Sequence, residues 1–185
     1  FNGFIYRRLT GNTCDEASCI AGAGLELNQA VYSQRDANFR GAEFQFQYDA
    51  LPVWNGMFGI EGQYDIVRAT FTDGSNVPRI PPQRVGGGIY YRDANWFARV
   101  NLLHAFAQND VSGVETPTPG YNRLRAELSY TTKLPKTDWW GAQQFTFGVV
   151  GDNLLNEDIR NAVAYNKDQV LMPGLGVRIF ANVKY

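Results

Sequence analysis

The sequence predicts an all-β fold, an antiparallel transmembrane β-barrel to which this chain contributes about eight strands. Three observations lead to this prediction. Apolar and polar residues alternate with a period of two over segments of strand length. The connections between those segments are alternately long and short. Tryptophans gather at the short connections. The composition, with 14% aromatic residues and 19 glycines, also suits strands and turns better than helices.

Residues 174–185 show the alternation most clearly. One face carries Leu175, Val177, Ile179, Ala181, Val183 and Tyr185, and the other is polar apart from Phe180. The length suits a tilted strand that crosses a bilayer, which needs about 9–11 residues. In such a barrel the apolar face meets lipid and the polar face lines a wet interior, the reverse of a soluble barrel.

Strands are expected, to within about 2–4 residues, at 1–8, 29–49, 56–71, 84–92, 96–106, 121–131, 142–152 and 174–185. The connections are 9–28, 50–55, 72–83, 93–95, 107–120, 132–141 and 153–173. Antiparallel outer-membrane barrels have short periplasmic turns and longer outer loops, so Tyr185 is expected near the periplasm. An aromatic girdle is expected at the short turns, from Trp54, Trp96, Trp139 and Trp140; ordinary core tryptophans are the alternative.

The run of glycines at 86–88 interrupts the alternation. A phosphate-binding loop would need a strand-to-helix context, which is missing here. A bend in the sheet or close packing of another element is the favoured interpretation. Asp152 and Asn153 end a strand and are expected to cap the following turn.

The polar faces of the predicted strands carry charges of both signs. We expect these to form a charged wall that faces the barrel lumen, rather than an acid/base site. The expected lumen-facing residues are Glu43, Glu61, Asp65, Arg99, Arg123, Arg125, Glu127 and Arg178.

Several functional classes are disfavoured. A net charge of −1 and the lack of a basic run argue against nucleic-acid binding. A single histidine and no Ser/His/Asp set argue against an enzyme, and no cofactor is expected. His104, near the outer rim, could ligate a transition metal, but a surface histidine is the simpler interpretation. Cys14 and Cys19 are expected to form a short disulfide in an oxidising compartment, with a free-thiol pair as the alternative.

Five features, in order along the chain, resemble the C-terminal part of a TonB-dependent outer-membrane receptor. They are residues 1–6 (FNGFIY), 32–43 (YSQRDANFRGAE), 79–84 (RIPPQR) and 150–156 (VGDNLLN), and the terminal strand with its aromatic end. Within this family, the motifs are most similar to those of zinc and siderophore importers. The resemblance implies a plugged barrel of about 22 strands, of which residues 1–185 are the closing part, with the plug domain outside this chain. The chain start, which falls within a strand-like pattern, fits such a truncation.

The resemblance implies a receptor in the Gram-negative outer membrane that binds a scarce nutrient, a metal ion, siderophore or similar chelate, at its outer loops. Energy would come from the TonB complex through the plug. The barrel-assembly machinery would recognise the terminal strand, with Gly176, Ile179, Val183 and Tyr185 as its signal. Loops on a rigid barrel commonly hold specificity, and the predicted ligand contacts are Tyr165, Asn166, Lys167 and Asp168.

Two alternatives stay open at this point. A complete eight-stranded barrel with a structural or adhesion role would pair the first and last strands directly. A soluble all-β binding module would need to form a cooperative core without detergent.

Overall fold

The computed structural model describes residues 1–9, 30–113, 115–135 and 141–185. Within these ranges the chain forms strands β1 (Phe4–Leu9), β2 (Ala30–Arg35), β3 (Ala37–Val53), β4 (Gly56–Phe71), β5 (Arg84–Arg92), β6 (Trp96–Ala105), β7 (Tyr121–Lys133), β8 (Gln144–Asp152) and β9 (Gly176–Lys184). No helix capable of spanning a membrane occurs in this part of the chain.

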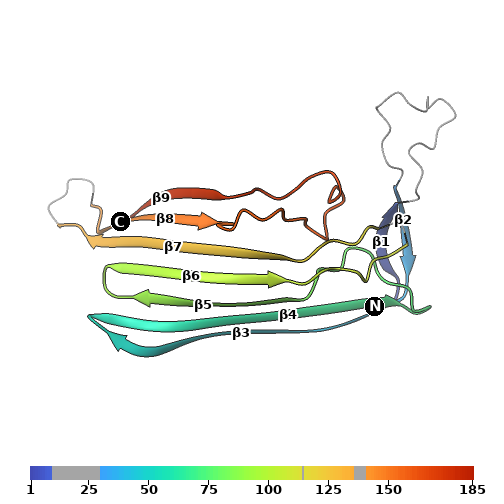
Figure 1. The fold of residues 1–185 in the computed structure, drawn as a ribbon, viewed down its shortest axis with the longest axis horizontal. Helices are drawn as coiled ribbons and strands as arrows, with labels where there is room; N and C mark the ends of the chain where they lie inside the picture. Colours follow the sequence, from blue (N-terminus) through green and yellow to red (C-terminus); the bar gives the residue numbers. More distant parts are fainter. Residues whose placement is uncertain (10–29, 114, 136–140) are drawn as a thin grey trace, which may run out of the picture.

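Strands β3 to β9 form one antiparallel sheet in sequence order, and β1 pairs with β2 in a separate hairpin (Figure 1). The two edge strands, β3 and β9, do not pair with each other. The described sheet is therefore open, and β1 does not meet β9 as a closed eight-stranded barrel would require.

The connections separate into two ends. The β3–β4 and β5–β6 turns lie at one end with the C-terminus, which we call the turn end (Figure 1). The β4–β5, β6–β7 and β8–β9 connections and the β1–β2 hairpin lie at the other, the loop end. The predicted alternation thus places the short connections at the turn end and the long connections at the loop end.

Three of the differences from the predicted strands have a visible local cause. The segment expected at 29–49 divides at Asp36, whose carboxylate accepts a hydrogen bond from the Gly3 backbone N–H over 2.7 Å. Its second part, β3, continues to Val53 through a register shift between Asp49 and Leu51, so the expected 50–55 connection shrinks to Trp54 and Asn55. The last strand begins at Gly176 rather than 174, because the Leu175 N–H bonds to the Asn156 side chain over 2.9 Å.

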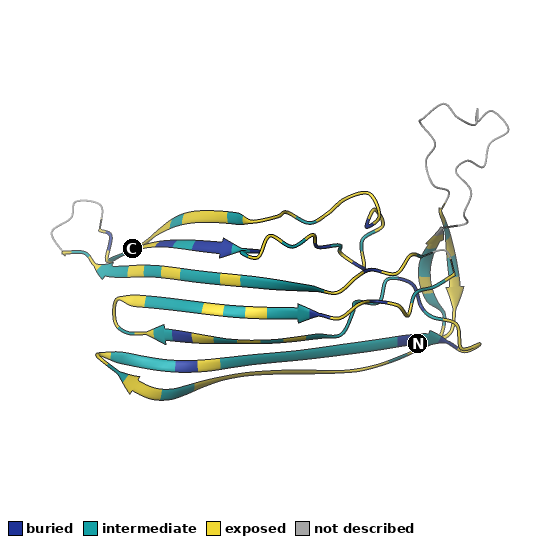
Figure 2. Cartoon of the chain, viewed as in Figure 1, coloured by how far each residue is buried: buried dark blue, intermediate teal, exposed yellow. Residues whose placement is uncertain are grey.

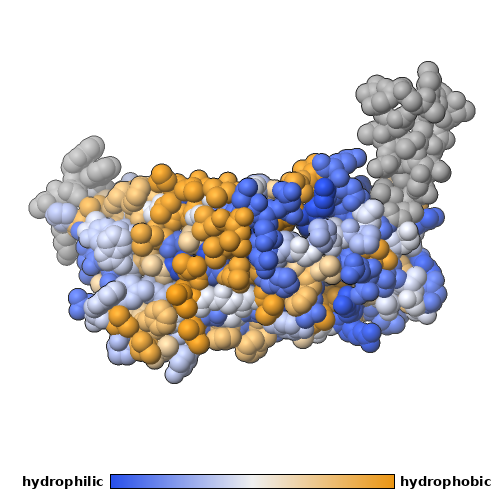
Figure 3. Space-filling view, viewed as in Figure 1, coloured by the Kyte–Doolittle hydropathy of each residue, from blue (hydrophilic) through white to orange (hydrophobic). Residues whose placement is uncertain are grey.

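Register places nearly all charged residues of β3–β9 on one face, which we call the charged face. The opposite, apolar face carries exposed hydrophobic side chains, among them Tyr48, Ile60, Ile89, Val100, Leu128 and Ile179. Most positions in these strands are exposed or half-buried, as expected of a single layer (Figure 2). In the space-filling view, apolar side chains gather toward the turn end and polar ones toward the loop end (Figure 3).

Aromatic side chains of the apolar face mark the turn end. The rings of Trp54 and Tyr91 lie 5.7 Å apart, and those of Trp96 and Tyr130 lie 4.8 Å apart. This arrangement fits the predicted interfacial girdle. Trp139 and Trp140 lie outside the described residues.

A small core forms at the loop end, where β3 begins and β4 ends. Ala37, Ala69, Phe71 and Val77 are buried there, and Phe4 and Tyr6 of β1 pack against them. The β1–β2 hairpin is thereby packed against the loop end of β3 and β4.

Glycines meet aromatic rings across neighbouring strands. A Cβ at Gly148 would overlap the ring of Phe180, and one at Gly59 would overlap Tyr90. Register places Phe180 on the charged face, where its ring covers Gly148. In the 86–88 run, a Cβ at Gly88 would lie 2.6 Å from the Val100 carbonyl oxygen and 2.8 Å from Asn101 Cβ, which agrees with the expected close packing.

Candidate functional site: the charged face and the loop end

The centre of the charged face is an ionic network around Arg99. The Arg99 guanidinium lies 3.5 Å from Glu61 and 3.3 Å from Glu127, on either side of β6. Asn101 donates to the other Glu61 oxygen over 3.2 Å, and Arg125 lies 4.0 Å from Glu127. Both carboxylates are largely covered, with side-chain exposures of 14% and 18%. The network therefore links β4, β6 and β7, across the intervening β5, through groups that are partly shielded from water.

A hollow of about 240 Å³ adjoins this network. Its lining includes the amide side chains of Gln45, Gln47 and Gln63 beside the charged groups of the network. These amides can both donate and accept hydrogen bonds. The hollow is therefore suited to a polar partner, and no catalytic constellation is present around it.

Further ion pairs extend the charged face in both directions. Arg84 binds Asp65 through Nε at 2.9 Å, and Arg123 forms an ion pair with Asp152. Near the turn end, Asp49 accepts hydrogen bonds from Tyr90, over 2.6 Å, and from Arg92. All eight charges predicted for this face share it by register. Glu43 lies opposite Asp65, and Arg178 has no ionic partner among the described residues.

Four further polar members of the charged face were not predicted: Arg84, Arg92, Asp49 and Asn101. The glycines of β5 hid the alternation that would have grouped Arg84 and Arg92 on one face. Asp49 is in phase with Glu43 and Gln47, but it is the last residue of the predicted 29–49 strand, where the alternation ends. For Asn101 the alternation itself was visible, since it shares a face with Arg99.

Tyr165 connects three segments at the loop end. The guanidinium carbons of Arg7, on β1, and Arg79, in the β4–β5 connection, each lie 3.1 Å from the Tyr165 ring centroid. Two guanidinium groups so close to one centroid must lie on opposite faces of the ring. Arg79 also donates to the Arg7 carbonyl over 2.9 Å, and burial lowers the pKa of Arg79. We call this arrangement the Tyr165 clamp.

The other three predicted ligand contacts lie beside the clamp. Lys167 is buried, and its carbonyl accepts a hydrogen bond from Arg160 over 2.5 Å. Asp168 accepts from Thr116 of the β6–β7 connection, also over 2.5 Å. The Asn166 carbonyl accepts the N–H groups of Gln169 and Val170. Asp168 thus connects the β8–β9 loop to the β6–β7 loop, Asn166 and Lys167 hold the β8–β9 loop to itself, and Tyr165 stays nearly half exposed at 47%.

Asn153 fastens the base of the β8–β9 connection. Its side chain donates to the carbonyls of Glu157 and Pro173 over 2.9 and 3.3 Å, and accepts the Glu157 N–H over 3.0 Å. The residue is buried and has a φ of 47°, a conformation that Asn tolerates well. The predicted turn cap is therefore found at Asn153, and it joins both ends of a long loop.

His104 lies on the apolar face at the loop end of β6. Its Nδ1 lies 2.8 Å from the Asn122 side-chain oxygen, and its ring packs edge-on against Phe106. Asn122 in turn donates from its backbone and side chain to Glu157, which lowers the pKa of that carboxyl. No set of three or more His, Cys, Asp or Glu side chains within the described ranges could hold a metal ion.

Two predicted groups lie at the ends of the described structure or beyond it. Cys14 and Cys19 fall outside the described residues. On β9, Ile179 and Val183 lie on the apolar face, Gly176 lies on the charged face opposite Asp152, and Tyr185 follows the strand with 68% of its surface exposed.

The sheet has one apolar face suited to lipid contact and one charged face, with short turns at one end and long loops at the other. These features define the wall of a membrane β-barrel. A model of the family described as "TonB dependent receptor-like, beta-barrel" matches residues 1–154, and the chain belongs to this family. Members are transport receptors rather than enzymes, work with the TonB system, and have barrel domains that are found in the outer membrane of Gram-negative bacteria.

Proposed function

We propose that this chain forms the C-terminal part of a receptor that binds a scarce nutrient at its outer loops for TonB-energised uptake. The proposed nutrient is a metal ion, a siderophore or a similar chelate. The family match supports a TonB-dependent transport receptor. A small closed barrel for adhesion is not favoured, because the edge strands of the described sheet do not pair.

The Tyr165 clamp is the observation that carries the proposal. It joins the β8–β9 connection to β1 and to the β4–β5 connection, and the Thr116 to Asp168 hydrogen bond adds the β6–β7 connection. The clamped loops stand at the end of the charged face, so a ligand captured there would meet a polar wall. Because guanidinium groups cover both faces of the Tyr165 ring, this surface presents positive charge and the Tyr165 ring edge and hydroxyl, which can contact an anionic chelate.

The charged face has a different part in the proposal. Its carboxylates and guanidinium groups would line the lumen and contact a plug domain, through which the TonB complex would act. The hollow beside Arg99 offers amides and charges to such a partner. Assembly into the membrane would depend on the terminal strand, with Gly176, Ile179, Val183 and Tyr185 recognised by the barrel-assembly machinery.

The test is an uptake assay with the complete receptor in a Gram-negative host that lacks its own metal-chelate receptors. Labelled ferric siderophores and zinc chelates are supplied to hosts with and without tonB. Uptake of at least one chelate that requires both the receptor and tonB is expected. Uptake that is unchanged without tonB, or no uptake of any chelate in the panel, would overturn the proposal.

Matched variants test the part played by the clamp. Tyr165→Ala removes the ring between the two guanidinium groups and is expected to lower chelate uptake about tenfold, since loss of both cation–π contacts costs on the order of 1–2 kcal/mol. Tyr165→Phe keeps the aromatic face and should keep the loops ordered, as measured by limited proteolysis of cells. Equal uptake by wild type and Tyr165→Ala would show that the clamp is not part of the ligand site.

A further inference from the structure

Two arginines break the uniformity of the apolar face. Arg40 on β3 and Arg68 on β4 are the charged residues of β3–β9 that register places on this face. All the other charged residues of these strands lie on the charged face: Glu43, Asp49, Glu61, Asp65, Arg84, Arg92, Arg99, Arg123, Arg125, Glu127, Lys133, Asp152, Arg178 and Lys184. The position of Arg40 and Arg68 on the apolar face therefore needs an explanation that applies to these two residues alone.

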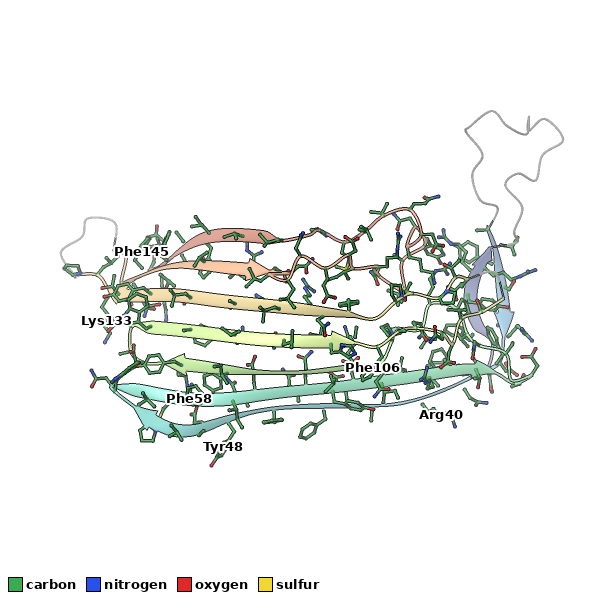
Figure 4. All side chains as sticks on the ribbon, viewed as in Figure 1. Arg40, Tyr48, Phe58, Phe106, Lys133 and Phe145 are labelled. Carbon is green, nitrogen blue, oxygen red and sulfur yellow. The ribbon has the colours of Figure 1, made fainter. Side chains whose placement is uncertain are left out.

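The height of the pair along the strands matches the edge of a bilayer. The residues of β3 on the apolar face run from Val53 to Ala42, directly before Arg40, and their partners on β4 run from Gly56 to Ile66. At about 3.4 Å per residue and a tilt of about 40°, this run along β4 rises about 26 Å, close to the apolar band of about 25 Å in outer-membrane barrels. Arg40 lies toward the loop end of β3 and Tyr48 nearer the turn end (Figure 4). The two guanidinium groups thus lie where outer-leaflet headgroups begin.

The two positive charges lie directly opposite each other. Arg40 and Arg68 are cross-strand partners in the β3–β4 register, and like charges in such a pair repel each other. Asp110 forms an ion pair with Arg68, and Arg40 has no acidic partner in the part of the chain that the structure describes. One negative charge for two guanidinium groups leaves a local positive excess.

The pair borders a hollow that could receive a small anion. A space of about 220 Å³ is lined by Arg40, Arg68, Thr70, Asn76, Ile80 and Asp110. The Arg68 side chain is 41% exposed, so its guanidinium remains reachable beside Asp110. A phosphomonoester can accept several hydrogen bonds from two guanidinium groups at once.

We propose that Arg40 and Arg68 bind the phosphate headgroup of an outer-leaflet lipid, whose acyl chains would lie along the apolar face below them. Apolar contact and charge pairing then act on the same lipid molecule, which a free phosphate ion cannot reproduce. The inference uses the placement of the apolar face in the membrane and does not depend on which nutrient the loops bind.

Native mass spectrometry of the complete receptor in neutral detergent tests the inference. The probes are phosphatidic acid, phosphatidylcholine and inorganic phosphate. Wild-type receptor should bind phosphatidic acid in preference to phosphatidylcholine. Each of Arg40→Gln and Arg68→Gln should weaken phosphatidic acid binding about fivefold, and the double variant about 25-fold, if each arginine near the surface contributes about 1 kcal/mol.

Two controls make the result specific. Arg178→Gln removes an arginine from the charged face and should leave phosphatidic acid binding unchanged, whereas Asp110→Asn should tighten it by freeing Arg68. Undiminished binding by the double variant, or equal competition by millimolar inorganic phosphate, would overturn the inference. Chelate uptake measured on the same variants keeps this outcome distinct from a failure of the proposed transport function.

Discussion

The charged face and the apolar face of the β3–β9 sheet alternate along every strand, yet they are stabilised in different ways. On the charged face, Arg99 contacts two carboxylates, and Phe180 covers Gly148. On the apolar face, side chains such as Ile89 and Val100 remain about half exposed, at 49% and 44%. A lipid environment satisfies apolar groups without specific partners, whereas a wet, charged wall needs matched partners. Substitutions should therefore have different consequences on the two faces.

The largest difference is expected for a charge placed in the middle of the apolar face. Val100→Arg should destabilise the barrel by about 2–4 kcal/mol, the cost of an arginine at the bilayer midplane. The matched control, Gln45→Arg, places the same side chain on the charged face and should cost less than about 1 kcal/mol. Urea unfolding of the complete receptor in lipid vesicles measures both. Equal destabilisation would contradict the assignment of the two faces.

The second test removes the centre of the ionic network. Arg99→Met should cost about 2 kcal/mol, because the partly covered Glu61 and Glu127 would lose the cation between them. Arg178→Met, at an arginine without an ionic partner among the described residues, should cost less than about 0.5 kcal/mol. The same unfolding assay applies, and a double-mutant cycle with Glu61→Gln isolates the coupling. Additive effects in that cycle would show that the pair does not interact.

A third test compares neighbouring positions on β9. Phe180→Ala should destabilise the barrel by about 1 kcal/mol, because it uncovers Gly148 to water and removes a cross-strand contact. Ile179→Ala, on the apolar face, should cost less in vesicles than a buried isoleucine would in a soluble core, since lipid chains can fill the space. If Ile179→Ala were the more damaging of the two, β9 would face the other way.

The smallest effect concerns acid, which should act on the loop end and leave the apolar face unaffected. Hydrogen bonds from Ser75, together with Arg35, lower the pKa of Asp73 in the β4–β5 connection to about 2. Because the folded-state pKa is below the unfolded value of about 3.9, this stabilisation is complete above about pH 4 and is lost as the pH falls toward 2. The hydrogen-exchange protection factors of residues 71–77 should fall between pH 4 and pH 2, and Asp73→Asn should abolish this fall. A wild-type profile that stays flat from pH 4 to pH 2 would contradict the Asp73 assignment.

The loop end holds both the proposed ligand site and the proposed lipid site. It is also the part of the chain where the sequence shows the fewest regular patterns. Alternation identified the eight charges expected to face the lumen as sharing one face of the sheet, but not that Arg99 lies between Glu61 and Glu127. Tyr165 was a candidate ligand contact on its residue type and loop position. Its place between Arg7 and Arg79, from β1 and the β4–β5 connection, could not be derived from any local pattern.

The sequence by itself determined the strand class, the two faces and the alternation of short turns with long loops. These follow from local geometry, because successive side chains of a strand point to opposite faces and turns need particular residues. The tertiary structure decided the division of the second strand at Asp36, the role of Phe180 over Gly148, the Tyr165 clamp, and the pairing of Arg40 with Arg68. Each of these depends on register or on contact between segments far apart in the chain, and a period of two carries no information about which residue lies opposite which.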